Sequence, residues 1–103
     1  PLEQVRLLSG LLSNTWDFAS ENIRAVKDAM LLSEHSVAGG RLYGKTGTSS
    51  PDGGTQSGWF VGFLEPGETT YCFAVNLQGE GCDGSTAADV ALQSLTTILS
   101  RTE

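Results

Sequence analysis

The chain has 103 residues, enough for a modest hydrophobic core, and we expect residues 1–103 to form a single domain. Its 12 acidic and 6 basic residues give a formal net charge of −6, which argues against nucleic acid as a partner because phosphate backbones are bound by clustered Lys and Arg. No apolar run in the sequence approaches the roughly 18 residues that a membrane-spanning helix requires.

The first third of the chain predicts two helices. Residues 2–13 carry apolar side chains at helical spacing, and so do residues 20–31. We expect Ser20 to cap the second helix, because serine is favoured at a helix N-cap. Trp16 and Phe18 lie in the connector between these helices, and we expect both to fill the core.

A polar segment follows the second helix. Residues 31–36 are predicted as a helix end followed by a loop. The loop holds His35, the single histidine, and no second ligand lies at metal-binding spacing from it. The sequence therefore predicts no metal site.

From residue 42 onward the pattern is typical of strands. Residues 42–48, 58–65 and 69–77 are rich in β-prone residues and predict a three-stranded antiparallel sheet. We expect the strand of Lys45 to lie at the sheet edge, joined to the others by a flexible loop at residues 49–57. Pro66 and Gly67 between the last two strands predict a hairpin with a type II turn.

The end of the chain predicts a helix after a cap at Asp83 or Ser85. Small residues in its first turns favour close packing on the sheet. The predicted fold class is therefore α+β, with two N-terminal helices, a three-stranded antiparallel sheet, and a C-terminal helix packed on that sheet.

Cys72 and Cys82 are expected to be free thiols. A strand from Cys72 to about residue 78 carries the chain ~20 Å away at ~3.3 Å per residue. The four residues back to Cys82 recover at most ~14 Å. A disulfide would therefore need a fully stretched loop.

Lys45 lies in a stretch rich in glycine and hydroxyl groups that allows two interpretations. Gly39-x-x-x-x-Gly44-Lys45-Thr46 satisfies the P-loop pattern, in which backbone N–H groups at a helix N-terminus hold phosphates. A P-loop requires a hydrophobic strand before its first glycine and a helix after its lysine. Here a polar loop is expected before the motif and helix-breaking residues follow it, so the sequence favours a strand.

On that strand, Lys45-Thr46-Gly47 is similar to the third motif of the penicillin-interactive serine enzymes. With Gly58-Trp59-Phe60-Val61-Gly62 downstream, the sequence resembles the C-terminal half of class D β-lactamases and, equally, the penicillin-sensing domains of BlaR/MecR-type receptors. The resemblance covers nearly the whole chain, and it implies a β-lactamase/transpeptidase-like fold. It also implies an extracytoplasmic location and no cofactor.

The resemblance assigns roles along this strand, toward a β-lactam or an acyl-D-Ala-D-Ala-like ligand. Lys45 and Thr48 would be catalytic, Lys45 through its charge and a proton relay and Thr48 through a backbone N–H in the oxyanion hole. Thr46, Gly47 and Thr48 would bind substrate, with Thr46 at the carboxylate and Gly47 giving the ligand room. The alternative is an ordinary edge strand.

Two features depart from the family pattern. The chain has no Ser-x-x-Lys, so the acyl-accepting serine and its activating lysine are missing, and the last helix does not begin with the arginine found in many class D enzymes. We therefore expect the chain alone to be inactive and to supply one wall of a penicillin site. Three interpretations stay open: a hydrolase, a sensor that remains acylated, or an inactive fragment that self-associates or pairs with the missing N-terminal half.

Overall fold

The computed structural model describes residues 1–14, 16–37, 39–50 and 55–101. Within them the chain forms, in order, α1 (Leu2–Leu12), α2 (Ser20–Met30), β1 (Leu31–Val37), β2 (Gly40–Ser49), β3 (Ser57–Glu65), β4 (Tyr71–Gln78) and α3 (Gly84–Arg101). The strands make one antiparallel sheet in the order β1-β2-β3-β4. The α+β prediction is confirmed, but the described sheet has four strands instead of three.

The additional strand is β1, in the segment that was predicted to be a loop. Its polar centre suggested a loop, yet its two ends pair with β2 through Leu31↔Tyr43 and Val37↔Gly40, and the register shifts between these ends. Such an irregularity is tolerated at the edge of a sheet, where one side of the strand needs no partner. Val37 is buried at the far end of β1, which holds the strand on the core.

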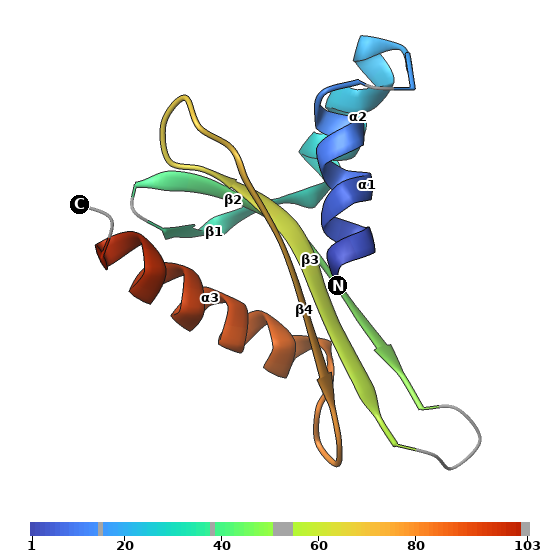
Figure 1. Cartoon of the computed structure of the whole chain (residues 1–103), viewed down its shortest axis with the longest axis vertical. Helices are drawn as coiled ribbons and strands as arrows, with labels where there is room; N and C mark the ends of the chain where they lie inside the picture. The colour runs from blue at the N-terminus through green and yellow to red at the C-terminus, as the bar shows by residue number, and fades with distance from the viewer. Residues whose placement is uncertain (15, 38, 51–54, 102–103) are drawn as a thin grey trace.

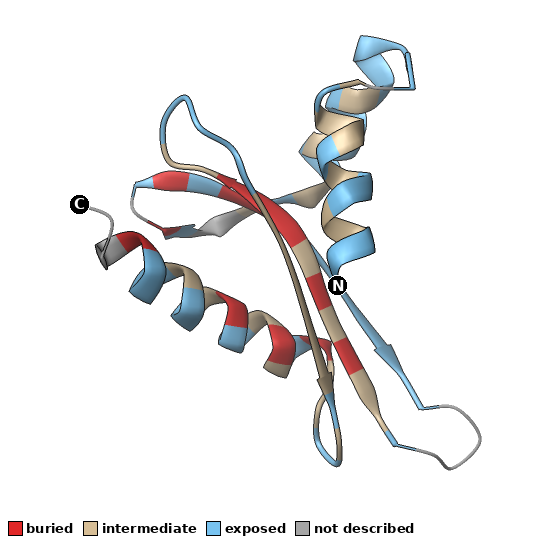
Figure 2. Ribbon diagram, in the orientation of Figure 1, coloured by how far each residue is buried: buried red, intermediate tan, exposed pale blue. Residues whose placement is uncertain are grey.

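The helices lie on opposite faces of the sheet (Figure 1). α3 packs on one face, mainly against β3, and α1 and α2 lie on the other face, over β4 and β2 respectively. On the α3 face, Phe60 packs against Ala87 and Ala91, and the small alanines allow the close approach predicted from the sequence. Figure 2 shows the buried residues along β3 and the facing side of α3.

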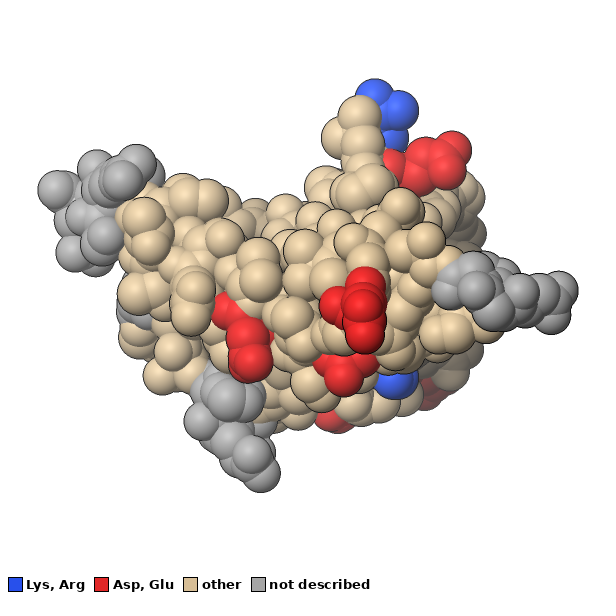
Figure 3. Space-filling model, turned by 90° about the horizontal axis from the view of Figure 1, so that it is seen from below, with Lys and Arg blue, Asp and Glu red and all other residues tan. Residues whose placement is uncertain are grey.

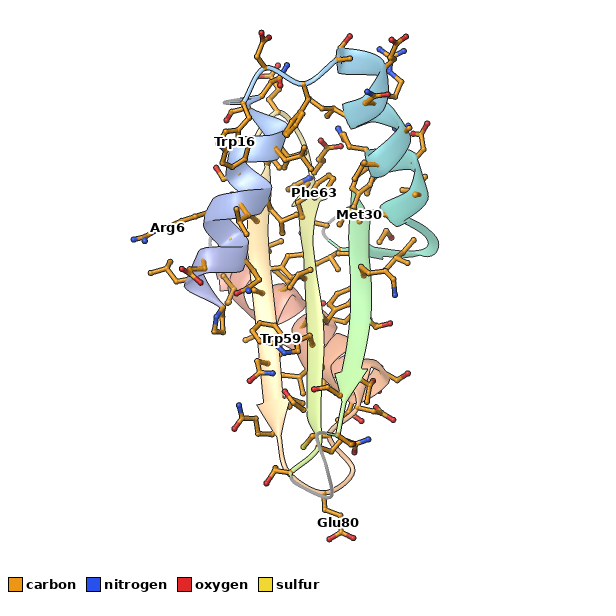
Figure 4. All side chains as sticks on the ribbon, turned by 90° about the vertical axis from the view of Figure 1, so that its right-hand side faces the viewer. Arg6, Trp16, Met30, Trp59, Phe63 and Glu80 are labelled. Atoms are coloured by element: carbon orange, nitrogen blue, oxygen red, sulfur yellow. The ribbon has the colours of Figure 1, made fainter. Side chains whose placement is uncertain are left out.

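On the other face, Lys27 of α2 contacts an aromatic pair of the sheet. The rings of Tyr43 and Phe63 stack with centroids 4.4 Å apart, and Phe63 lies between α1 and α2 in Figure 4. The Lys27 Nζ atom lies 5.4 Å and 5.6 Å from the two ring centroids and 3.1 Å from a Glu65 carboxylate oxygen. Lys27 therefore makes both a cation–π and an ionic contact with the sheet.

We expect Lys27→Met to lower the free energy of unfolding by about 1–2 kcal/mol, because it removes a half-buried ion pair and the cation–π contact while keeping an apolar stem. Arg24→Met on the exposed side of the same helix is the control and should change stability by less than about 0.5 kcal/mol. Urea denaturation of both variants would measure the difference. Equal effects would show that the loss reflects helix propensity and not the Lys27 contacts.

The core prediction for Trp16 and Phe18 is wrong, since both side chains are 49% exposed. Trp16 packs over Gly10 of α1 and against Phe18, not into the sheet. Neither α1 nor α2 has a buried residue. The apolar residues of these helices are therefore only partly covered within the described chain.

The helix caps and the hairpin turn gave mixed outcomes. Asp83 caps α3, as one of the two predicted alternatives, by accepting the Thr86 N–H at 2.9 Å. Ser20 was expected to cap α2, but Ala19 occupies that position and no side-chain cap bond forms. The β3–β4 hairpin is present, but Gly67 lacks the positive φ that a type II turn needs.

The thiols of Cys72 and Cys82 are free, in agreement with the prediction.

A candidate ligand-binding strand

The candidate site lies on the second half of β2, which has an open edge. β1 pairs with residues 40–43 of β2, whereas β3 pairs with all of residues 41–49. The chain enters β1 directly from α2 at Leu31, so among the described residues no strand covers the other side of residues 44–49. The predicted edge position of Lys45 is therefore correct for this half of the strand.

Side chains on this segment alternate between the two faces. Lys45 pairs with Val61 and shares the face of α1 and α2, whereas Thr46 pairs with Phe60 and shares the face of α3. The Lys45 Nζ atom donates to the Thr46 carbonyl at 2.8 Å. The ammonium group and the threonine hydroxyls therefore start on opposite faces, and a ligand could meet both only at the strand edge.

The first turn of α3 contacts Thr48. The Gly84 N–H donates to Thr48 Oγ1 at 2.9 Å. The Thr48 O–H remains available as a donor, and it donates no hydrogen bond to another of the described residues. An acceptor group of a ligand could therefore take this O–H as its hydrogen-bond donor.

Asp83 holds this first turn in place. Its carboxylate accepts hydrogen bonds from the Thr86 N–H and from Thr86 Oγ1, both at 2.9 Å. The backbone bond and then the side-chain bond from Thr86 hold the pKa of Asp83 below its ordinary value of 3.8. Because the folded-state pKa is lowered, the ionised cap stabilises the chain above that ordinary value and stops doing so as the pH falls through the folded-state pKa.

We therefore expect the difference in melting temperature between the parent chain and Asp83→Asn to shrink as the pH is lowered from about 5 to about 2, because asparagine does not titrate. Thermal unfolding followed by circular dichroism over this range would measure it. Asp89→Asn, at an exposed residue later in α3, is the matched control and should keep the parent's pH dependence. A constant difference between the parent and Asp83→Asn would contradict the capping role.

Some glycines of the sheet have no room for a side chain, whereas Gly47 has room for one. At Gly44 a Cβ atom would meet the ring of Phe60, and at Gly58 it would meet the backbone carbonyl of Asp83. At Gly47, by contrast, the nearest atom would be Trp59 Cβ at 3.9 Å, an ordinary contact distance. The packing of the described chain explains the absence of a side chain at Gly44 and Gly58, but not at Gly47.

A pocket of about 530 Å³ runs beside the open edge, between the end of α2 and the first half of α3. Apolar and polar residues line it together. They are Ala29, Leu31, Leu32, Gly44, Lys45, Thr46, Phe60, Ser85, Ala88, Asp89 and Leu92. Two of the four predicted site residues, Lys45 and Thr46, thus face a pocket, while Gly47 and Thr48 continue the same edge beyond it.

The P-loop interpretation is wrong. Its lysine lies inside β2, which continues to Ser49, so no helix N-terminus presents backbone N–H groups at Gly44-Lys45-Thr46. A strand does precede the motif, but it is the antiparallel partner of β2. On the described part of the face shown in Figure 3, charged groups are few and separated, with no basic stripe.

Other reactive groups lie away from this edge. Burial raises the pKa of the Cys72 thiol, which disfavours the nucleophilic thiolate. The side chain of His35 lies outside the described residues. Within the described chain, no set of three or more His, Cys, Asp or Glu side chains is grouped to hold a metal ion, and no helix has the length and apolar character to cross a membrane.

Sequence reasoning missed two features. The penicillin-interactive serine enzymes have a second motif of the type Ser-Asp-Asn. A similar Ser-x-Asn triplet is present at Ser20-Glu21-Asn22, but it opens α2, and Ser20 lines a separate polar pocket with Arg41 and Glu65. This triplet therefore lies outside the candidate site. The contact between Thr48 and Gly84 joins residues 36 positions apart, and no local pattern predicts it.

Comparison with known proteins assigns the family. Residues 1–96 match the family model of the penicillin binding protein transpeptidase domain. The chain belongs to this transpeptidase family. Regulatory protein BlaR1 of Bacillus licheniformis is 46% identical over 96 residues, which are 92% of this chain and 16% of BlaR1.

A solved structure extends the comparison to the fold. The C-terminal domain of the Bacillus licheniformis BlaR penicillin-receptor matches with a TM-score of 0.85 and 44% identity, over 94% of this chain and 39% of that domain. The probable β-lactamase YbxI of Bacillus subtilis is 37% identical over 81 residues, which are 79% of this chain and 29% of YbxI. The chain thus spans well under half of each of these transpeptidase-family relatives.

Proposed function

We propose that the chain forms one wall of a β-lactam site in a penicillin-sensing domain of the BlaR type. Gly47 carries this proposal, because it leaves free space on an open strand edge that the packing of the described chain does not require. An extended, peptide-like ligand can add to such an edge through backbone hydrogen bonds. A β-lactam resembles an acyl-D-Ala-D-Ala backbone and carries a carboxylate.

In this proposal each residue of the strand has a role. The Lys45 ammonium supplies positive charge beside the reacting serine and assists proton transfer. Thr46 and the donating hydroxyl of Thr48 bind the ligand carboxylate. The Thr48 N–H is one oxyanion-hole donor, a contact whose loss typically costs about 3–4 kcal/mol of transition-state stabilisation. Gly47 lets the ligand backbone lie against β2.

The nucleophile comes from another segment in this proposal. Because residues 1–103 contain no Ser-x-x-Lys, we infer that the acylated serine and its lysine belong to a part of the transpeptidase domain outside these residues. The exposed apolar residues of α1 and α2, including Leu7 and Val26, then pack against that part. Without it, the chain self-associates through the same surface. The extracytoplasmic location belongs to this proposal as well.

A second candidate is a class D hydrolase. The similarity to the probable β-lactamase YbxI favours it, whereas the higher identity to BlaR1 and to the solved penicillin-receptor domain favours the sensor. The two candidates share the same wall and differ in how fast the acyl-enzyme is hydrolysed.

A chimera tests the β-lactam wall that both candidates share. Residues 1–96 replace the matching part of the Bacillus licheniformis BlaR domain, and intact mass is followed after mixing with benzylpenicillin. We expect a gain of one penicillin mass that persists, with slower acylation in the Lys45→Ala chimera. If the unaltered BlaR domain is acylated and the folded chimera is not, the proposed function is wrong.

A further inference from the structure

The first residue of α3 lies against the candidate ligand strand. Gly84 is buried, and a Cβ atom there would lie 2.8 Å from Thr46 Cβ and 3.1 Å from the backbone N and O atoms of Gly47. The contact therefore involves the backbone of the ligand strand as well as a side chain. Even a methyl group at Gly84 would force β2 or α3 to move.

The start of α3 has little freedom to move away. The Asp83 carbonyl lies where a side chain at Gly58 would be, so it packs directly on β3. The Asp83 side chain caps the helix through Thr86, and the preceding loop is bonded to the strands through Gly79 N–H to the Gln56 carbonyl at 2.9 Å. Residues 46–48 of β2, in contrast, pair with β3 on one side and with no other described strand. A clash at Gly84 should therefore displace the strand and not the helix.

We propose that Gly84 is a positioning residue, whose missing side chain and whose N–H bond to Thr48 set the position of the backbone at residues 46–48. Its effect on a ligand rests on the proposed function, because it acts through the strand edge that would receive a β-lactam. Its effect on the position of the strand does not rest on the proposed function. A shift of this backbone by a fraction of an ångström moves the Thr48 N–H and hydroxyl away from the ligand atoms that they would meet.

The ligand-free experiment compares Gly84→Ala with Gly67→Ala in the full 103-residue chain. Gly67 is the matched control because its Cβ would meet nothing within 4 Å and its φ is not positive. We expect Gly84→Ala to shift the amide resonances of Thr46, Gly47 and Thr48 in the folded protein, and Gly67→Ala to leave them unchanged. A Gly84→Ala spectrum that matches the control at these amides would overturn the proposal, whatever its melting temperature.

A second pair of variants covers the case in which Gly84→Ala does not fold. Thr48→Val removes the acceptor of the Gly84 N–H while keeping the shape of the side chain, and Thr48→Ser keeps the acceptor. We expect faster hydrogen exchange at the Gly84 amide in Thr48→Val and the parent rate in Thr48→Ser. Equal exchange in the two variants would contradict the positioning contact.

The consequence for ligand is measured separately in the chimera. There we expect Gly84→Ala to slow acylation by benzylpenicillin by about tenfold to a hundredfold, the scale of a sub-ångström to 1 Å misplacement of a reacting group, with Gly67→Ala at the parent rate. Shifted amides with unchanged acylation would show that Gly84 positions the strand but that the strand does not hold the ligand. Slowed acylation without shifted amides would overturn the positioning role and leave the proposed function in place.

Discussion

Replacing Phe60 with alanine is expected to lower the free energy of unfolding by about 3–5 kcal/mol, the range found when a buried aromatic side chain is truncated. Phe60 is 1% exposed at the centre of the contact between the sheet and α3, beside Ala87 and Ala91. Small domains have only about 5–15 kcal/mol of stability in total. The variant should therefore be largely unfolded in mild denaturant.

The loss should reach the candidate site as well. The Phe60 ring fills the space over Gly44, so it supports the strand that carries Lys45. Urea denaturation followed by circular dichroism measures the change, and Phe18→Ala, at a residue 49% exposed, is the control that should change stability far less. If the two variants lost equal stability, the core would not be centred on β3 and α3.

Gly47→Val is expected to have the opposite profile, with little loss of stability and a large loss of ligand binding. Valine suits a strand, and among the described residues only Trp59 would lie within 4 Å of its Cβ. Its methyl groups would occupy the space where the ligand backbone is proposed to lie. In the chimera we expect acylation by benzylpenicillin to slow by at least about tenfold, which corresponds to about 1.4 kcal/mol.

The measurement for Gly47 combines the acylation rate, from intact mass over time, with the melting temperature. Gly44→Ala is the variant for comparison. Its Cβ would meet the Phe60 ring, so we expect its main effect to be a lower melting temperature. Gly47→Val chimeras that fold and are acylated at the parent rate would show that the open edge of β2 is not the ligand position.

The elements that follow a regular pattern were predictable from the sequence. The helices at either end and the β3–β4 hairpin have clear periodicity, and Lys45 was correctly placed on a strand. β1 was missed because its polar centre, around Ser33 to Ser36, is typical of a loop, and only its pairing with β2 makes it a strand. Tertiary pairing decides the structure of such a segment, and local propensity does not.

Predictions that depend on distant neighbours were less successful. Trp16 and Phe18 are apolar, but apolar character does not say what part of the fold will cover a residue. Residues 45–48 were correctly placed on a strand, whereas Gly84 was not singled out, because a glycine at the start of a helix has an ordinary local explanation. Its importance follows from a close contact that only the folded chain creates.

The two tryptophans of the chain give it a built-in fluorescent reporter. Trp59 Cβ lies at contact distance from the empty side of Gly47, and Figure 4 shows Trp59 on the sheet at a distance from Trp16, which lies at α1. A molecule settling on the edge of β2 would change the solvent around the Trp59 indole, while the Trp16 indole would keep its surroundings. A Trp16→Phe variant therefore turns the intrinsic emission of the protein into an optical signal from the neighbourhood of Gly47, without a dye or a label.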